Sequence, residues 1–317
     1  MIAGLSKLID WSAIHFAAVR MPRPDGRDQR LAEAQQRIAS PDFFPAAVEA
    51  AKVQFSGADR LHFATPLPGV PEENNTVHGR LYRCAERWQE RPTVLLLHGW
   101  NDAINHYSRF PSMSAHLNRH GFNAATLEAP FHFQRSPRQF AAWSNFLSPD
   151  ILHTVEAARQ AIAETRAFAL WLRQQGTPAL GLMGVSLGGW LGGLAVCHDA
   201  LFSCAVLLTP VACLDRLVEE VAFCRGIRQA WQGRPVQTGR LNLTEGRPAV
   251  PKENILLIEA FHDLFVPRET MEQLWRAWDQ PEMWRLAYGH ITVLRAPGLN
   301  GRIIHWMAPR LLARAAK

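Results

Sequence analysis

The sequence has little of several features that would point to a particular function. It contains only 5 cysteines in 317 residues, and no two of them have the Cys-x-x-Cys spacing of zinc and redox sites. An odd number of thiols also argues against a disulfide framework, so we expect reduced core cysteines and a cytoplasmic protein. The five are Cys84, Cys197, Cys204, Cys213 and Cys224.

A basic stripe is also missing. Lysine and arginine together number 34 and the net charge is +6, but the basic residues are scattered among acidic ones and are not interleaved with aromatics. This pattern argues against nucleic-acid binding. A solvated, arginine-rich surface explains the charge, and weak attraction to an anionic lipid or substrate is the alternative.

The chain begins without a long uninterrupted apolar run. Residues 1–20 place apolar side chains at roughly helical intervals, but Lys7 and Asp10 interrupt them. The segment is too short and too broken for a membrane span, and it lacks the basic start and cleavage site of a signal peptide. We expect it to dock on the protein's own core, with interfacial membrane binding as the alternative.

The first quarter of the chain contains two different kinds of segment. Residues 1–57 predict a helical N-terminal extension that a Pro/Gly-rich stretch, Met21 to Gly26, divides into two helices. Residues 60–66 and 77–84 have β character around a connection rich in Pro, Gly and Asn. They predict an antiparallel pair at the start of a sheet.

From Thr93 onward, apolar runs alternate with helix-length segments. Near-continuous apolar strands separated in this way predict a mostly parallel α/β sheet, doubly wound and covered on both faces. The longest helix is expected to begin at Ser148-Pro149-Asp150 and to stop at Gly176. The expected strands are Thr93–Leu97, Phe122–Leu127, Ala179–Val185, Cys204–Leu208, Asn254–Ile258 and Met283–Tyr288.

Two connections at the carboxyl ends of expected strands are unusually long. One follows Leu127 and the other follows Leu208, and residues 211–250 of the second predict an inserted lid. Their aromatics favour an apolar portion in the substrate, although packing against the core would also explain them. The aromatic residues and histidine concerned are Phe131, His132, Phe133, Phe140, Trp143, Phe146, Phe223 and Trp231.

The most informative motif is Gly184-Val185-Ser186-Leu187-Gly188, which lies between an apolar run and a glycine-rich segment that can form a helix. This is the sequence form of a nucleophile elbow. A serine hydroxyl is a poor nucleophile unless a tight turn exposes it within reach of a base. Glycines on either side permit that turn because they have no Cβ atoms to clash.

The expected partners of the serine follow later strands. Asp263 comes just after one apolar run, and His290 follows the next expected strand. A carboxylate at the first position can hold an imidazole in one tautomer, and the imidazole can act as the base. Glu259 and Asp215 are alternatives for the acid. The alternative histidine, His305, lies in the apolar pattern of the last expected helix and is expected to pack there.

With these motifs in place, residues 58–317 resemble the α/β-hydrolase superfamily, in its serine esterase-like branch. The resemblance rests on Leu97-His98-Gly99-Trp100, on the elbow, on Asp263-Leu264-Phe265-Val266-Pro267 and on Gly289-His290. It implies that Ser186 is the nucleophile, His290 the general base and acid, and Asp263 the orienting carboxylate.

The same resemblance implies an oxyanion hole made by the backbone N–H groups of Leu187 and Trp100. His98 is expected to support that loop. His116 and His120 have the spacing of metal ligands on a helix, but no third ligand is evident, and an exposed helix face is the better explanation. No metal or cofactor is therefore expected.

The expected function is hydrolysis of a carboxylic ester through an acyl-enzyme intermediate. The substrate would be a small molecule with an apolar acyl or aromatic portion. The same residues could act on a thioester, an amide or a peptide, or could transfer the acyl group to another acceptor. A non-catalytic ligand-binding protein on the same scaffold is the alternative from another class, because a fold does not decide a function.

Overall fold

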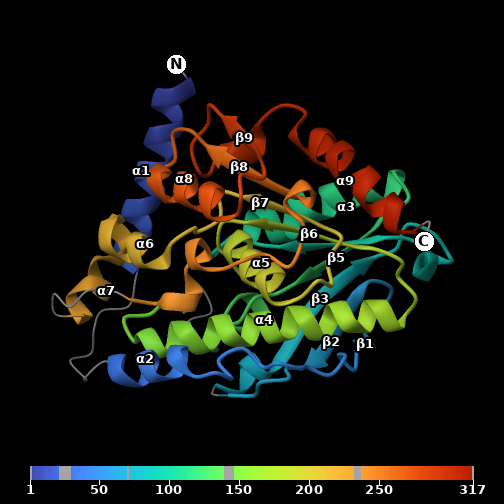
Figure 1. Cartoon of the computed structure of the whole chain (residues 1–317), viewed down its shortest axis with the longest axis horizontal. Coiled ribbons are helices and arrows are strands. Elements are labelled where there is room, and N and C mark those ends of the chain that lie inside the picture. Colours follow the sequence, from blue (N-terminus) through green and yellow to red (C-terminus); the bar gives the residue numbers. More distant parts are fainter. Residues whose placement is uncertain (1, 21–29, 70, 139–145, 232–236, 316–317) are drawn as a thin grey trace.

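The computed structural model describes residues 2–20, 30–69, 71–138, 146–231 and 237–315. One nine-stranded sheet runs through the molecule in the order β1-β2-β3-β5-β4-β6-β7-β8-β9 (Figure 1). The strands are β1 (Gln54–Phe55), β2 (Arg60–Ala64), β3 (Thr76–Tyr82), β4 (Thr93–Leu97), β5 (Asn123–Leu127), β6 (Leu180–Val185), β7 (Cys204–Leu208), β8 (Ile255–Ala260) and β9 (Glu282–Leu286).

The sheet is antiparallel where it starts and parallel beyond. β2 pairs antiparallel with β3, and β3 pairs antiparallel with β5. All pairs from β5 through β4 and β6 to β9 are parallel. The predicted α/β fold is confirmed, but the sequence analysis missed β1, which adds to β2 through only two residues. A strand that short is too brief to display an alternating pattern.

The five central strands form the inner core of the molecule. Every residue of β4, β5, β6, β7 and β8 is buried, as expected of strands with helices on both faces. β3 alternates between buried and partly exposed positions, and the edge strand β9 has no fully buried residue. Side chains just beyond the carboxyl ends of the central strands therefore stand on the most deeply buried part of the sheet.

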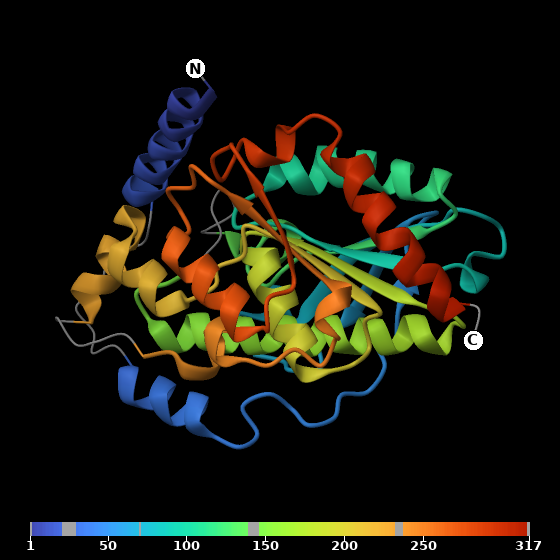
Figure 2. The same cartoon turned by 45° about the horizontal axis from the view of Figure 1, so that its top comes forward.

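The helices cover both faces of the sheet. Buried residues of α3 and α9 form one apolar cluster, and those of α4, α5 and α8 belong to another; Figure 2 shows these two layers. α2 packs on the outer side of α4. The helices are α1 (Ile2–Arg20), α2 (Leu31–Ala39), α3 (Phe110–Arg119), α4 (Ile151–Gln174), α5 (Leu187–His198), α6 (Leu214–Glu220), α7 (Arg225–Ala230), α8 (Arg268–Ala277) and α9 (Leu299–Ala315).

The long helix α4 begins slightly later than predicted. Asp150 occupies the N-cap position and Ile151 is the first helical residue. The hydroxyl of Ser148 accepts a hydrogen bond from the Asp150 N–H at 3.2 Å, so this serine caps a turn ahead of the helix. The helix stops where expected, because Gly176 has a φ of 102°, a conformation that favours glycine after a helix end.

The N-terminal extension contains the two predicted helices, α1 and α2, but it is not helical throughout. Residues 40–53 form no helix, and the predicted breaker, Met21 to Gly26, lies outside the described residues. α1 stands beside α6 at the carboxyl ends of the strands (Figure 1) and contacts residues 222–224. In the part of the chain that the structure describes, no helix is long and apolar enough to cross a membrane.

Candidate active site

The elbow predicted around Ser186 joins β6 to α5. Ser186 has a φ of 53° and a ψ of −114°, a strained conformation for a residue with a side chain. A Cβ atom on Gly184 would lie 2.2 Å from the carbonyl oxygen of Gly188, and one on Gly188 would lie 2.2 Å from that of Leu97. Both glycines are therefore required by close backbone approaches, and the turn presents the serine side chain at the strand end.

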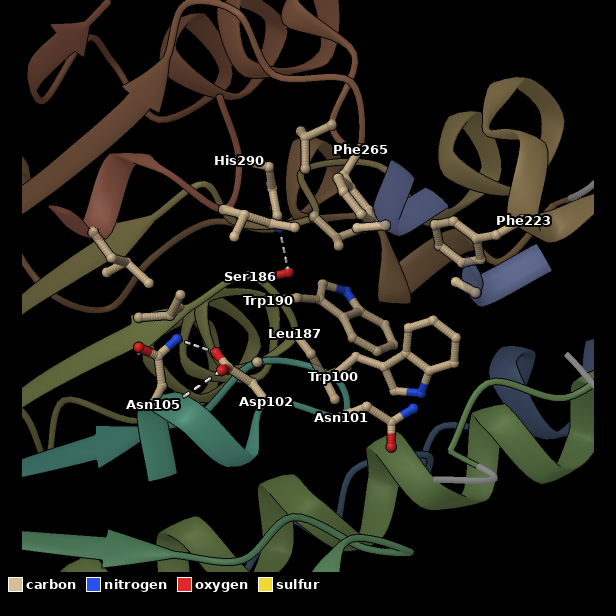
Figure 3. Close-up of a pocket in the computed structure, with 18 of the residues that line it drawn as sticks. Trp100, Asn101, Asp102, Asn105, Ser186, Leu187, Trp190, Phe223, Phe265 and His290 are labelled. Carbon is tan, nitrogen blue, oxygen red and sulfur yellow. Dashed lines mark hydrogen bonds between the residues drawn. The ribbon is translucent and has the colours of Figure 1, made fainter. Parts of the chain in front are cut away.

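Three of the predicted side chains meet in one hydrogen-bonded chain. The Oγ of Ser186 lies 2.8 Å from Nε2 of His290, and Nδ1 of His290 lies 2.7 Å from Oδ2 of Asp263. The other carboxylate oxygen of Asp263 accepts the N–H groups of Phe265 and Val266 at 2.7 and 2.9 Å. The carboxylate is thus fixed and holds the imidazole of His290. Figure 3 shows the hydrogen bond from that imidazole to the Ser186 hydroxyl.

The surroundings of His290 favour its protonated form. Burial opposes protonation, but the charge of Asp263 and the hydrogen bond to it, together with Asp10 and Asp102, outweigh that effect and raise the pKa of His290 above its usual value of 6.5. An imidazole held in this way can stabilise the positive charge that it gains when it accepts a proton.

The residues expected to bind an oxyanion lie beside the serine. Leu187 is the first residue of α5, and Trp100 follows β4; both line the same cavity as Ser186. His98 supports the β4 loop, because its Nδ1–H donates to the Gly99 carbonyl at 2.8 Å and its Nε2 accepts the Ala129 N–H at 3.0 Å. Burial lowers the pKa of His98 well below 6.5, so the imidazole is neutral.

A cavity of about 440 Å³ opens above Ser186 and His290. Its apolar wall comes from elements far apart in the sequence, and Figure 3 shows Trp100, Trp190 and Phe223 gathered around the serine. Its polar lining includes Asn101, Asp102, Asn105, Arg109 and Arg295. The apolar lining residues are Ala13, Phe16, Ala17, Trp100, Ile104, Leu147, Val185, Leu187, Trp190, Val211, Leu214, Leu217, Phe223, Phe265, Val266, Ile291 and Leu294.

The two long connections contribute unequally to this cavity. The segment after β7 supplies Val211, Leu214, Leu217 and Phe223, whereas Leu147 is the one lining residue among the described residues of the segment after β5. The described aromatics of that segment, Phe131, Phe133 and Phe146, and also His132, are not lining residues. Of the two explanations that the sequence left open for them, packing outside the cavity is the one that holds. Phe140 and Trp143 lie outside the described residues. Trp231 is buried but does not line the cavity.

Sequence reasoning missed the part of the site that comes from α1. Ala13, Phe16 and Ala17 line the cavity, and the fully buried side chain of Asp10 accepts the backbone N–H of His290 at 2.7 Å. The interruption of the apolar pattern at Asp10 was the available signal. It counted only against a membrane span, because nothing in the local sequence names a partner 280 residues away.

The alternative acids have other partners. Glu259 is buried in β8 and pairs with Arg285 at 2.8 Å and with Arg268 at 3.4 Å. Asp215 lies in α6, where it accepts hydrogen bonds from Thr238 and from the Asn242 amide. Neither carboxylate is hydrogen-bonded to His290.

The remaining histidines lie away from this chain of hydrogen bonds. His305 is exposed on α9, so the expectation that it packs in the apolar pattern of that helix is wrong. His116 is partly exposed on α3 and His120, at the C-cap of that helix, is exposed. The ring of each is hydrogen-bonded to the carbonyl four residues earlier. Across residues 2–20, 30–69, 71–138, 146–231 and 237–315, no group of three or more His, Cys, Asp or Glu side chains could hold a metal ion.

Solved structures with this fold include several esterases. The esterase Pf2001 of Pyrococcus furiosus matches with a TM-score of 0.54 at 15% identity, over 84% of this chain and 97% of its own. An acetyl xylan esterase from Paenibacillus sp. R4 matches with a TM-score of 0.56 at 14% identity, over 91% and 98%. Est1E from Butyrivibrio proteoclasticus matches with a TM-score of 0.52 at 10% identity, over 75% and 95%. At such low identity, these similarities show the fold.

Sequence comparison gives closer relatives and the family. Two uncharacterized proteins from two strains of Mycobacterium tuberculosis are 30% identical over 244 residues, which are 71% of this chain and 57% of theirs. This chain therefore matches little more than half the length of those relatives. The family model described as alpha/beta hydrolase domain containing 18 matches residues 38–232, which is more than half of the chain, and the protein belongs to this α/β-hydrolase family.

Proposed function

We propose that this protein is a serine hydrolase that cleaves a carboxylic ester through an acyl-enzyme intermediate. The observation that carries the proposal is the chain of hydrogen bonds from Ser186 through His290 to Asp263, at the floor of a largely apolar cavity. Membership of an α/β-hydrolase family and the esterases among the proteins of the same fold support it.

In the first half of the reaction, the Ser186 oxygen bonds to the ester carbonyl carbon while Nε2 of His290 takes the hydroxyl proton. The carbonyl oxygen becomes an oxyanion, and the N–H groups of Leu187 and Trp100 are the proposed donors to it. The carbon–oxygen bond of the ester then breaks. His290 gives its proton to the departing alkoxide, so the alcohol leaves and the acyl group stays on Ser186.

In the second half, a water molecule attacks the acyl carbon while His290 takes one of its protons. The bond to the Ser186 oxygen breaks, that oxygen recovers the proton from His290, and the carboxylic acid leaves. Asp263 stays ionised throughout and stabilises the imidazolium. This sequence of steps requires no cofactor or metal ion.

The proposal extends to the organisation of the chain. Residues 58–317 would form the hydrolase domain, with residues 211–250 as a lid and residues 1–57 as an extension. The apolar lining supports a small-molecule substrate with an apolar acyl or aromatic portion. All five cysteines are free thiols, which supports a reducing compartment such as the cytoplasm.

A fluorophosphonate probe tests whether Ser186 is a nucleophile. We expect the purified protein to be labelled at Ser186, and Ser186→Ala to lower ester turnover by roughly 10⁴-fold or more, because such residues act as a unit. Ser112→Ala is the matched control, since Ser112 is exposed on α3. A folded Ser186→Ala protein that keeps more than about a tenth of the activity would overturn the assignment.

The reaction class needs a second measurement. Acyl esters of graded chain length, run beside matched amides and thioesters, would distinguish an esterase from an amidase, a peptidase or a thioesterase. Adding an alcohol or thiol acceptor would reveal acyl transfer as a second product. A folded protein that neither reacts with the probe nor turns over any of these compounds would favour the non-catalytic ligand-binding alternative.

A further inference from the structure

The carboxylate of Asp10 connects the N-terminal helix to both loops that carry the base and its acid. Its Oδ2 accepts the N–H of His290 at 2.7 Å and that of Leu264 at 3.3 Å. Its Oδ1 accepts the N–H of Ile291 at 3.1 Å. Leu264 follows Asp263 directly, so one side chain from α1 fixes the backbone on both sides of the hydrogen bond between Asp263 and His290.

The loop that carries His290 is shaped to admit this carboxylate. A Cβ atom on Gly289 would lie 2.8 Å from Oδ2 of Asp10, so only a residue without a side chain permits so close an approach. One turn earlier in α1, the hydroxyl of Ser6 lies 3.0 Å from that of Thr292, which in turn accepts the Gly289 N–H at 2.9 Å. Two successive turns of α1 therefore contact the loop from Gly289 to Thr292.

Asp10 occupies an unusual environment for an acidic side chain. It is fully buried, and none of the ion pairs between described residues involves it. Burial raises the pKa of this carboxyl, and the bonds from the His290 and Ile291 amides act in the opposite direction. Burying a charge is costly unless other groups compensate it, and here the compensating groups are backbone amides and the nearby imidazole of His290. A carboxylate at this buried position is explained if the backbone amides that it binds must be held in place.

We propose that Asp10 is a positioning residue for the base: it holds the His290 loop against the Asp263 loop, so that the N-terminal helix is part of the active site. This inference rests on the proposed hydrolase function and deepens it. It also explains why Gly289 precedes the histidine. Ala13, Phe16 and Ala17 of the same helix line the cavity, so α1 both orients the base and forms part of the substrate wall.

Two roles of Asp10 can be distinguished: it could hold the loops only by packing and hydrogen bonds, or its charge could also act on the His290 imidazole. The carboxylates of Asp263, Asp10 and Asp102 favour the protonated form of the His290 imidazole, and the charged side chains of Arg109 and Arg295 line the same cavity. The ring of Phe265 stacks on it with a centroid distance of 4.7 Å. Removal of the charge at Asp10 should therefore shift the pH at which kcat/KM falls on acidification, here called the acid limb of the pH profile. Loss of helix packing alone would leave that pH unchanged.

The test compares Asp10→Asn with the wild-type protein in ester hydrolysis. An asparagine has one acceptor oxygen where the aspartate has two, and it carries no charge. We expect kcat to fall roughly 10- to 100-fold because a misplaced base loses alignment, with a smaller change in KM. The acid limb of kcat/KM should move to lower pH, since a neutral side chain no longer stabilises the imidazolium.

Three further variants serve as references. Asp10→Glu keeps the charge on a longer side chain, so its acid limb should stay closer to that of the wild type even where kcat falls. Ile14→Ala removes a buried apolar side chain one turn further along α1 and should lower the Tm without moving the acid limb. Lys7→Ala changes an exposed position and should behave as the wild type.

The outcomes separate this inference from the function on which it rests. An active wild-type protein whose Asp10→Asn variant has the same kcat and acid limb as Lys7→Ala would overturn the role of Asp10 and leave the hydrolase proposal intact. Parallel losses in Asp10→Asn and Ile14→Ala with unmoved acid limbs would also overturn it. A wild-type protein inert toward both ester and fluorophosphonate would overturn the hydrolase proposal and this inference with it. Should Asp10→Asn fail to fold, Asp10→Ser decides by the same criterion, because a serine also removes the charge.

Discussion

The segments that follow β5 and β7 begin at the same edge of the sheet and are both rich in apolar side chains, yet they occupy different places. Phe131 and Phe146, after β5, are buried away from the cavity, whereas Leu217 and Phe223, after β7, line it. Aromatic content therefore does not distinguish a pocket wall from a packed connection. The difference lies in the polar groups that anchor each segment.

The β5 segment is held by a buried ion pair. Arg135 is fully buried, and its guanidinium donates to both carboxylate oxygens of Glu164 in α4, at 2.7 and 2.6 Å. It also donates to the carbonyls of Glu128 and Asn74. These bonds draw the segment onto α4. The β7 segment has different anchors: Asp215 in α6 accepts hydrogen bonds from Thr238 and from the Asn242 amide, and Leu217 and Phe223 of this segment line the cavity.

Breaking the buried pair should have the largest effect on the β5 segment. Arg135→Met leaves the Glu164 carboxylate buried without its partner, and we expect the free energy of unfolding to fall by about 3–5 kcal/mol. Urea unfolding measures this change. The control is Arg87→Ala, because Arg87 pairs with Glu90 on the surface and exposed pairs contribute little. Equal losses in the two variants would show that the buried pair does not anchor the segment.

A substitution in the β7 segment should instead act on substrate choice. Phe223 lines the cavity and stacks on Trp100 with a centroid distance of 5.3 Å. We expect Phe223→Ala to lower kcat/KM for long acyl esters roughly 10- to 100-fold relative to short ones, because this ring contacts the remote part of the substrate. Labelling of Ser186 by a small fluorophosphonate should change little.

Phe131→Ala is the matched control for that experiment. Phe131 is as deeply buried as Phe223 but lies outside the cavity, so its loss should lower stability without changing the preference for chain length. A folded Phe223→Ala protein with an unaltered chain-length profile would remove the functional distinction between the two segments. The β7 segment would then be an ordinary surface connection.

The buried histidines after β4 and β5 differ from His290 in the direction of their pKa shifts. Burial lowers the pKa of His132, after β5, to about 4 and holds that of His98, after β4, well below 6.5. The pKa of His290 is raised. Because the base must be neutral, kcat/KM should fall on acidification through a single ionisation whose midpoint lies above pH 6.5. A rate that stays flat to about pH 5 would contradict His290 as the base.

His290 and His132 should contribute to the pH dependence of folding stability with opposite signs. Protonated His290 is favoured in the fold, so its contribution is complete below pH 6.5 and is lost as the pH rises through its raised pKa. His132 is neutral in the fold, so its contribution is lost as the pH falls from 6.5 toward about 4. Urea unfolding of His132→Phe and the wild type between pH 4 and 8 measures this difference.

The smallest effect is expected at a histidine remote from both segments. His305 is exposed on α9, and His305→Ala should change the free energy of unfolding by less than about 0.5 kcal/mol and leave Ser186 labelling unchanged. His290→Ala should abolish that labelling. Reversed behaviour of these two variants would mean that the base has been assigned to the wrong histidine.

The sheet and the three hydrogen-bonded side chains of the site could be placed from sequence because they depend on strand ends. Ser186, Asp263 and His290 each follow a predicted strand, and parallel strands bring their carboxyl ends to one edge. His305 was predicted to be packed but is exposed. A helix with a largely apolar pattern can carry a polar residue on its exposed side, and periodicity alone did not show which side that was.

The cavity wall and Asp10 could not be placed in the same way. Phe131 and Phe223 have the same side chain in comparable segments, and only the path of the backbone decides which one faces the serine. Among the described residues, the Asp10 carboxylate is bonded to backbone amides beyond residue 263, and no local sequence pattern reveals such partners. Long-range contacts of this kind depend on the assembled fold.

The bond between Asp10 and His290 also imposes an order of events during synthesis. The two residues are 280 positions apart, and at about 5–20 residues per second a ribosome needs roughly 15 to 60 s to add the second after the first. The nucleophile elbow leaves the ribosome well before the segment that carries its base. An emerging chain would therefore carry Ser186 without an aligned base until both ends of the polypeptide have met, which would delay any hydrolytic activity until translation is nearly complete.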